Sequence, residues 1–187
     1  MPTAHQNDSN TDNDACAPSV YRVYVYKNYK NFQPSLDLAP TIEMLLCYVP
    51  AENLVGLKYI ELTNSDCTRH MRRGKTWSRG KKVRLVDCLG FYYGDHITIL
   101  ADNMIRWIPS SAHRWSLMKG FTVAWVLYHE IGHHIHLAQR PEYREKEDVA
   151  DHYRDKLLRK YMRTRYRYTW RLIRLGAKFL RWRARYR

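Results

Sequence analysis

The alternation of apolar and polar positions predicts two short strands in the first third of the chain. Residues 20–26 and 57–62 alternate β-branched or aromatic side chains with polar ones, which is the pattern of a strand with one buried face. Between them, residues 41–48 have the spacing of a short helix that ends before Pro50. This part of the chain is therefore predicted to run strand, helix, strand.

The middle of the chain predicts further strands separated by polar segments. Residues 63–82 are polar and basic and contain two glycines, which indicates a loop or the two ends of a hairpin. Residues 83–86 predict a short strand, and residues 91–100 predict a longer one that a Gly-Asp pair interrupts with a bulge or turn. Residues 101–114 contain a proline and two serines, so we expect a connection there.

The last third of the chain predicts helices. Residues 115–137 form a long, mostly apolar run, which indicates one buried helix. Pro141 suits the first turn of a second helix, which continues to about residue 163, and residues 169–186 predict a last, basic helix. Together with the strands, these helices predict an α+β fold in which a small mixed or antiparallel sheet packs on helices.

Composition divides the chain into three parts. Residues 1–19 are polar and nearly free of large apolar side chains, so we expect a disordered tail. The 187 residues otherwise suit one domain, which we place at residues 20–165. Residues 166–187 are predicted to form a basic helical extension of that domain.

The net charge of +14 is concentrated at the end of the chain. Residues 154–187 contain eleven arginines and three lysines but one acid, so the rest of the chain is close to neutral. Arginine forks suit phosphate groups, which makes nucleic acid one candidate partner. An anionic membrane or acidic protein is a second candidate, and a plain solvated helix face is a third. The candidate nucleic-acid contacts are Arg171, Arg174, Arg181 and Arg183.

The cysteines and apolar segments bear on the compartment. None of the four cysteines forms a CxxC pair, and the first residues contain no apolar core of a signal peptide, so we expect free thiols in a reducing compartment. Cys67 and His70 form a CxxH pair, a weaker candidate for a second zinc site. The longest uncharged apolar stretch, residues 121–128, is too short to cross a bilayer. We therefore predict a cytoplasmic protein without a transmembrane segment.

The long apolar run ends in a motif that carries metal chemistry. His129 and His133 are four residues apart, so on a helix both imidazoles face the same side and can bind one metal ion. Glu130 beside the first histidine can reach a water molecule on that ion as a general base. Gly132 inside the motif is unfavourable in a helix by about 1 kcal/mol relative to alanine, which indicates that another group approaches closely there.

A catalytic zinc site needs a third protein ligand. The position six residues after His133 is Gln139, which excludes the pattern with a third histidine there. His134 and His136 do not share the face of the two motif histidines. The remaining class takes a carboxylate from the next helix, and we predict Glu147 in this role.

The acids and small residue around Glu147 favour this assignment, although Asp148 and His152 remain alternatives. Asp151 lies one turn further along the same helix face and can accept a ring N–H from a ligand histidine. Ala150 between them is small enough to let two helices pack closely around an ion.

The combination of His129-Glu130-x-x-His133 with Glu147-x-x-Ala150-Asp151 resembles the gluzincin metallopeptidases, in particular the minigluzincins and the ImmA/IrrE-type peptidases. The resemblance covers roughly residues 90–160 and implies a zincin-like fold. It implies one Zn²⁺ ion and the hydrolysis of peptide bonds in a protein or peptide substrate. It also implies an edge strand that binds the extended substrate, for which residues 91–100 are positioned, with Ile97, Thr98 and Ile99 as the expected contacts.

Two features depart from the family pattern. The basic C-terminal region has no counterpart, and no residue clearly matches the histidine or tyrosine that stabilises the transition state. The leading function is a zinc-dependent metallopeptidase with Glu130 as general base. The alternative is a nucleic-acid-binding protein whose metal site is structural or non-catalytic. The candidates for transition-state stabilisation are Tyr92, Tyr93, Tyr143, His152 and Tyr153.

Overall fold

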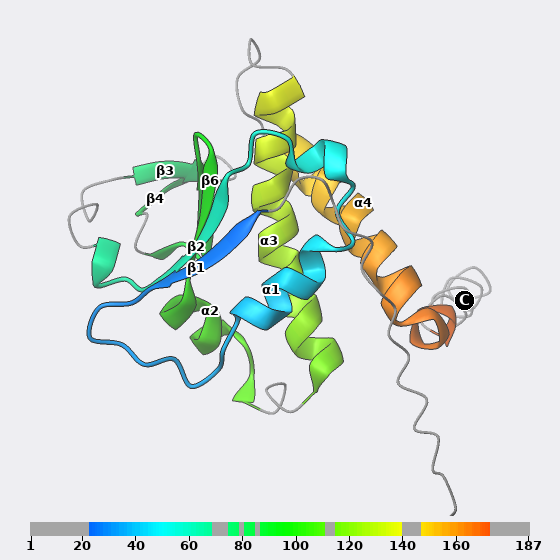
Figure 1. Ribbon diagram of the computed structural model, residues 1–187, viewed down its shortest axis with the longest axis horizontal. Coiled ribbons are helices and arrows are strands. Elements are labelled where there is room, and N and C mark those ends of the chain that lie inside the picture. The colour runs from blue at the N-terminus through cyan, green and yellow to red at the C-terminus, as the bar shows by residue number, and fades with distance from the viewer. Residues whose placement is uncertain are drawn as a thin grey trace, which may run out of the picture.

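The protein has a mixed α+β architecture, with a small sheet packed on helices (Figure 1). The structure is a computed structural model. It describes residues 23–68, 75–78, 81–84, 87–110, 115–139 and 147–172, and every structural statement below refers to these residues.

The main sheet contains four strands, in the order β1-β2-β6-β5. The three strands β1, β2 and β6 are parallel, and β5 pairs antiparallel to β6 at one edge. The parallel pairing of β1 and β2 follows from the helical crossover between them. The strands are β1 (Tyr24–Asn28), β2 (Tyr59–Thr63), β5 (Gly90–Tyr93) and β6 (His96–Leu100).

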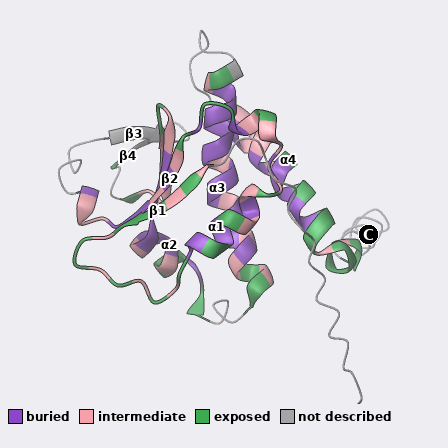
Figure 2. Cartoon of the chain, viewed as in Figure 1, coloured by how far each residue is buried: buried purple, intermediate pink, exposed green. Residues whose placement is uncertain are grey.

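Helices cover the sheet, and α3 is the long central helix against it (Figure 1). Alternate residues of the two inner strands, Ile60 and Leu62 of β2 and Ile97 and Ile99 of β6, are fully buried. This period of two produces the core. Much of α3 is buried as well (Figure 2). The helices are α1 (Ala39–Leu46), the 3₁₀ helix η1 (Ala51–Leu54), α2 (Ala101–Trp107), α3 (Ser116–Gln139) and α4 (Glu147–Arg165).

The early strands, the first helix and the long helix are confirmed within a few residues of the predicted bounds. The loop or hairpin predicted over residues 63–82 contains β3 (Lys75–Ser78), which pairs antiparallel with β4 (Lys81–Arg84) in a separate two-stranded sheet. The short strand predicted at residues 83–86 therefore begins two residues earlier. Residues 167–172 are helical, and the remainder of the predicted basic helix lies outside the described residues. The tail predicted to be disordered, Pro141 and His70 also lie outside the described residues.

One prediction for the middle of the chain is confirmed and another is wrong. The turn predicted at Gly94-Asp95 divides residues 91–100 into a hairpin of β5 and β6, because Gly94 adopts a positive φ of 63° and turns the chain. The connection over residues 101–114 begins with helix α2. In α2, Ala101 and Met104 are buried at helical spacing, and the serines and proline that suggested a loop follow the helix.

The cysteines also differ from the prediction. Cys67 and Cys88 are free thiols, but Cys47 is disulfide-bonded, so the expectation of free thiols is wrong for this residue. The prediction of a reducing compartment depended on free thiols, and the disulfide at Cys47 weakens it. In the described ranges, no helix combines the length and apolarity needed to cross a membrane.

Candidate metal centre

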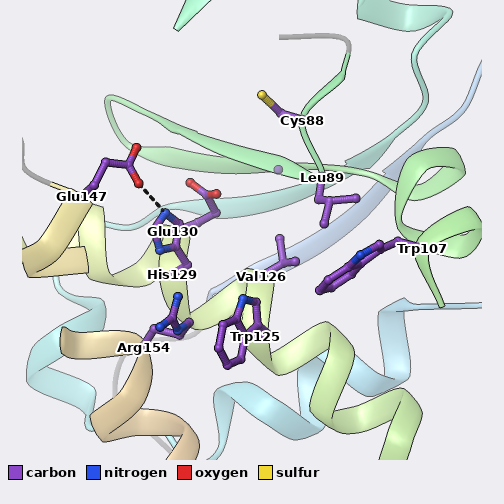
Figure 3. Close-up of a pocket in the computed structure, with 10 residues that line it drawn as sticks. Cys88, Leu89, Trp107, Trp125, Val126, His129, Glu130, Glu147 and Arg154 are labelled. Atoms are coloured by element: carbon purple, nitrogen blue, oxygen red, sulfur yellow. Dashed lines mark ion pairs between the residues drawn. The ribbon is translucent and has the colours of Figure 1, made fainter. Parts of the chain in front are cut away.

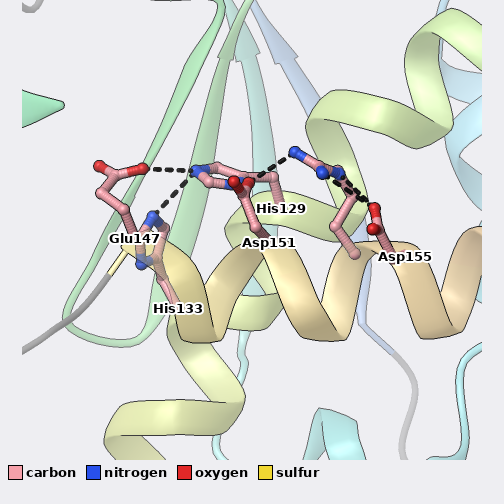
Figure 4. A network of polar contacts seen from close by, with 6 residues as sticks. His129, His133, Glu147, Asp151 and Asp155 are labelled. Carbon is pink, nitrogen blue, oxygen red and sulfur yellow. Dashed lines mark hydrogen bonds and ion pairs between the residues drawn. The ribbon is translucent and has the colours of Figure 1, made fainter. Parts of the chain in front are cut away.

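Helices α3 and α4 bring three potential ligand atoms together. The Nε2 atoms of His129 and His133 lie 3.1 Å apart on one face of α3 (Figure 4). The carboxylate of Glu147, the first residue of α4, places Oε2 3.3 Å from His129 Nε2. One ligand atom from each of the three residues lies within 4.8 Å of the other two, so this group could hold a metal ion.

The spacing of these atoms suits a small tetrahedral ion. Metal–ligand distances near 2.0–2.1 Å in a tetrahedral site separate neighbouring ligand atoms by roughly 3.3 Å. The two measured separations that involve His129 are 3.1 and 3.3 Å. Asp148 and His152, the two alternatives to Glu147 as third ligand, are exposed and do not belong to this group. The ligands predicted from the sequence are thus the ones that the fold brings together.

His129 lies beside a carboxylate of α4. Its Nδ1 atom is 3.0 Å from Oδ1 of Asp151, which is within ion-pair distance but lacks hydrogen-bond geometry. Burial, and next the nearby His133, lowers the pKa of His129 to about 4, although Asp151 opposes this shift. The imidazole is therefore neutral at pH 7, as a metal ligand must be.

Asp151 belongs to a longer polar network that sequence analysis did not identify. Arg154 Nη1 donates to Asp151 Oδ1 at 2.5 Å, and Arg154 Nη2 donates to Asp155 at 2.8 Å. The guanidinium also lies 3.8 Å from the ring centre of Trp125 on α3, and Arg154 is buried. The spacing of three residues between Asp151 and Arg154 on one helix permits this contact, but it does not indicate that Arg154 is the cation that becomes buried.

The close approach of α3 and α4 depends on Gly132. A Cβ atom at this position would lie 2.6 Å from the carbonyl oxygen of Ala150 and 2.8 Å from its Cα. Both atoms belong to the backbone and cannot move aside without displacing α4. The glycine inside the motif is thus explained by helix packing, in agreement with the prediction, and this packing positions Glu147 and Asp151 beside the two histidines.

A cavity of about 330 Å³ opens beside the three ligands (Figure 3). His129, Glu130 and Glu147 lie at one end, and Trp107 and Trp125 lie at the other. Glu130 is 6% exposed and contributes to the wall, so its carboxylate shares this space with the ligand group. The cavity therefore combines a polar end, beside the potential metal ligands, with a largely apolar end. Its remaining lining residues are Cys88, Leu89, Gly90, Val126 and Arg154.

Cys88 in this wall has a raised pKa. Burial, and next the nearby carboxylate of Glu130, raise the pKa of its thiol to about 11. The thiol therefore stays protonated, whereas a nucleophilic cysteine needs a lowered pKa.

The prediction that residues 97–99 form the substrate-binding edge strand is wrong. Ile97, Thr98 and Ile99 belong to β6, which is paired on both sides and is buried. The edge of the sheet nearest the site is β5, because the Gly94 turn folds this strand back against β6. Gly90 of β5 lies against α3: a Cβ atom there would meet Val126 at 3.3 Å and Glu130 at 3.5 Å.

The additional histidines of the motif region do not join the ligand group. His134 contacts the hydroxyl of Tyr92 at 3.1 Å through Nδ1 and the carbonyl of Val55 at 3.0 Å through Nε2. It thus ties α3 to β5 and to the segment after η1. His136 is buried, and it too lies outside the group of potential ligands.

Among the described residues, none of the candidates for transition-state stabilisation lines the cavity. Tyr92 contacts His134 on the helix side of β5, and Tyr93 is 72% exposed. His152 and Tyr153 pack their rings against each other on α4, and Tyr143 lies outside the described residues. Arg154 is the cationic group that lines the cavity.

The predicted nucleic-acid contacts fall at the end of the described chain. Arg171 is exposed on the helical segment at residues 167–172. Arg174, Arg181 and Arg183 lie outside the described residues.

Comparison with known proteins does not identify a relative. A scan against protein-family models found no match, and searches of curated proteins and of solved structures found none.

Proposed function

We propose that the protein is a zinc-dependent metallopeptidase of the gluzincin type, with a zincin-like domain at residues 20–165 and a basic helical extension at residues 166–187. The observation that carries this proposal is the convergence of His129, His133 and Glu147 beside a cavity that His129, Glu147 and Glu130 line. Two imidazoles, one carboxylate and an adjacent glutamate form the donor set of a catalytic zinc site with a general base.

In this proposal His129, His133 and Glu147 hold the ion, and the carboxylate of Asp151 lies beside Nδ1 of His129. A bound zinc ion supplies a water molecule with a pKa near 7 and polarises the carbonyl of the substrate. Glu130 accepts the proton of the attacking water and passes it to the leaving amine. The fold sets the separation of these four groups, because His129, Glu130 and His133 lie on α3 and Glu147 lies on α4, which packs against it.

The substrate proposed is an extended peptide. β5 lies at the edge of the sheet beside α3, so its outer backbone groups are available to pair with a peptide strand. The apolar end of the cavity, with Trp107, Trp125 and Val126, fits a large apolar side chain next to the cleaved bond.

The test begins with the metal content of the purified protein. Wild type is expected to contain about one zinc per chain by mass spectrometry, and both His133→Ala and Glu147→Ala are expected to lose it. The matched controls are His152→Ala and Asp148→Ala, which remove the same side-chain types at exposed neighbouring positions and should retain zinc. Wild type without stoichiometric metal would exclude the proposed function.

The peptidase activity needs its own assay. The protein is incubated with a library of proteome-derived peptides, and the cleaved bonds are identified by mass spectrometry. Cleavage is expected next to large apolar residues and should disappear in Glu130→Gln but persist in Glu43→Gln, a control at an exposed glutamate. A protein that keeps zinc but cleaves nothing would instead favour the alternative, a nucleic-acid-binding protein with a structural metal site.

A further inference from the structure

The second half of α4 and the segment after it form a cationic surface that the metal centre does not use. Seven cations occur between residues 156 and 172 without an acid among them, and all seven are exposed. Four of them follow the spacing i, i+3, i+4, i+7 and so share one helix face. We call this set the α4 basic surface, and its members are Lys156, Arg159, Lys160, Arg163, Arg165, Arg167 and Arg171.

The charges of this surface are not neutralised within the described structure. The ion pairs of α4 join Arg154, Glu147, Asp151 and Asp155, all before residue 156. In the described part of the chain, no ion pair involves a member of the α4 basic surface. Seven neighbouring cations repel one another, so a bound polyanion would be favoured here.

The other face of the same helix is already occupied. Leu157, Leu158, Tyr161 and Met162 are buried in the core, and Tyr161 packs against Tyr48 and Tyr166. No large apolar side chain is exposed along α4 itself, and in the described helical segment after it the exposed ones are Tyr168 and Leu172. The cationic face of α4 therefore consists of charged and polar side chains, and one exposed leucine beyond it does not form an apolar stripe that could insert into a bilayer.

We propose that the α4 basic surface binds the phosphate backbone of nucleic acid. Five of its seven cations are arginines, whose planar forks match phosphate oxygens. Cations one helical turn apart are separated by about 5.4 Å, which allows several to contact the closely spaced phosphates of one duplex. The partner is recognised by charge, so binding is independent of base sequence.

The segment after α4 adds an aromatic contact to this surface. Tyr168 is 69% exposed, and Arg167 lies 5.1 Å from the centre of its ring. An exposed ring beside a guanidinium is suited to contact a sugar or a base next to a bound phosphate.

This surface and the proposed catalytic cavity can be used at the same time. Arg154 is the most C-terminal residue that lines the cavity, and the α4 basic surface begins two residues later. The second half of α4 extends away from the sheet (Figure 1). Binding of nucleic acid is therefore independent of the metal and of Glu130.

The test measures binding of the full-length protein to a fluorescein-labelled 25-base-pair DNA duplex of random sequence by fluorescence anisotropy. The surface variant carries Lys156→Gln, Arg159→Gln, Lys160→Gln and Arg163→Gln. The control variant carries Lys27→Gln, Lys30→Gln, Lys58→Gln and Arg84→Gln, which lowers the net charge equally at other exposed positions. Circular dichroism melting shows whether each variant folds like wild type.

The surface variant is expected to bind the duplex at least about tenfold more weakly at 0.15 M salt, with a salt dependence reduced by about three phosphate contacts. The control variant, the metal-free protein and Glu130→Gln should bind like wild type. Equal binding by the surface and control variants would overturn the proposal. So would binding to vesicles that contain phosphatidylserine with no binding to the duplex, because the partner would then be a membrane.

Discussion

The two halves of α4 share one buried face but differ in what they present to the rest of the molecule. Residues 147–155 contain four acids and one buried arginine, linked to His129 by ion pairs and hydrogen bonds. Residues 156–172 contain seven exposed cations and no acid. The helix dipole favours acids in the first turn and cations in the last, but it acts over about one turn at each end. The division between acids and cations extends further than one turn, so it separates the candidate metal centre from the α4 basic surface.

The largest expected effect lies at the proposed general base, Glu130 of α3, which lines the cavity beside the acidic half of α4. Glu130→Gln removes proton transfer but keeps the size of the side chain, so hydrolysis should fall by roughly 10²–10⁴-fold. Zinc content and DNA binding should stay at the wild-type level, which the zinc assay and the anisotropy assay check. An active Glu130→Gln protein would show that another group acts as the base.

The next effect concerns the contact that joins the two helices. Gly132→Ala places a methyl group against the backbone of Ala150, so it should reduce the free energy of unfolding by about 1–3 kcal/mol. It should also weaken zinc binding, because α4 moves away from α3. Denaturant unfolding and metal titration measure these effects. Ala150→Gly combined with Gly132→Ala should not restore either quantity, since the clash is with backbone atoms; full rescue would refute this explanation.

A smaller effect is expected at the carboxylate beside His129. Asp151→Asn removes the charge next to its Nδ1 atom, so zinc affinity should fall by roughly 10–100-fold. Competition with a chelator measures this affinity. Asp148→Asn provides the control, because Asp148 is an exposed acid on the same helix. Equal affinities for the two variants would mean that Asp151 does not support the ligand.

The last expected effect separates two arginines of α4. Arg154→Met removes a buried guanidinium that bonds Asp151 and Asp155, so the free energy of unfolding should decrease by about 1–3 kcal/mol. Arg163→Met changes an exposed side chain and should alter it by less than about 0.5 kcal/mol. Urea unfolding compares the two. A larger loss for Arg163→Met would contradict the division of the helix into a structural half and a surface half.

Sequence patterns predicted much of the frame of this site. The long apolar run located α3, and helical spacing placed His129 and His133 on one face. The same reasoning selected Glu147 and Asp151, because a ligand set on two helices needs a carboxylate near the start of the second helix. These predictions depend on local periodicity, which the fold preserves.

The features that the sequence did not predict depend on contacts between distant residues. The sequence indicates a bulge or turn at Gly94, but it does not indicate that this turn makes β5, and not β6, the edge of the sheet beside α3. The cavity combines Trp107 of α2 with Trp125 of α3, which no local pattern relates. Arg154 was grouped with its basic neighbours because the sequence does not indicate which cation of a helix is buried.

The location of the ligands on two helices has a consequence for the stability of the fold. His129 and His133 lie on α3 and Glu147 lies on α4, so a metal ion bound by the three residues would cross-link the two helices. An ion that binds only the assembled helices adds about 4 kcal/mol to stability when free metal exceeds the dissociation constant a thousandfold. The free metal concentration would then set the melting temperature as well as the activity, and depletion of metal would expose α4 to proteolysis.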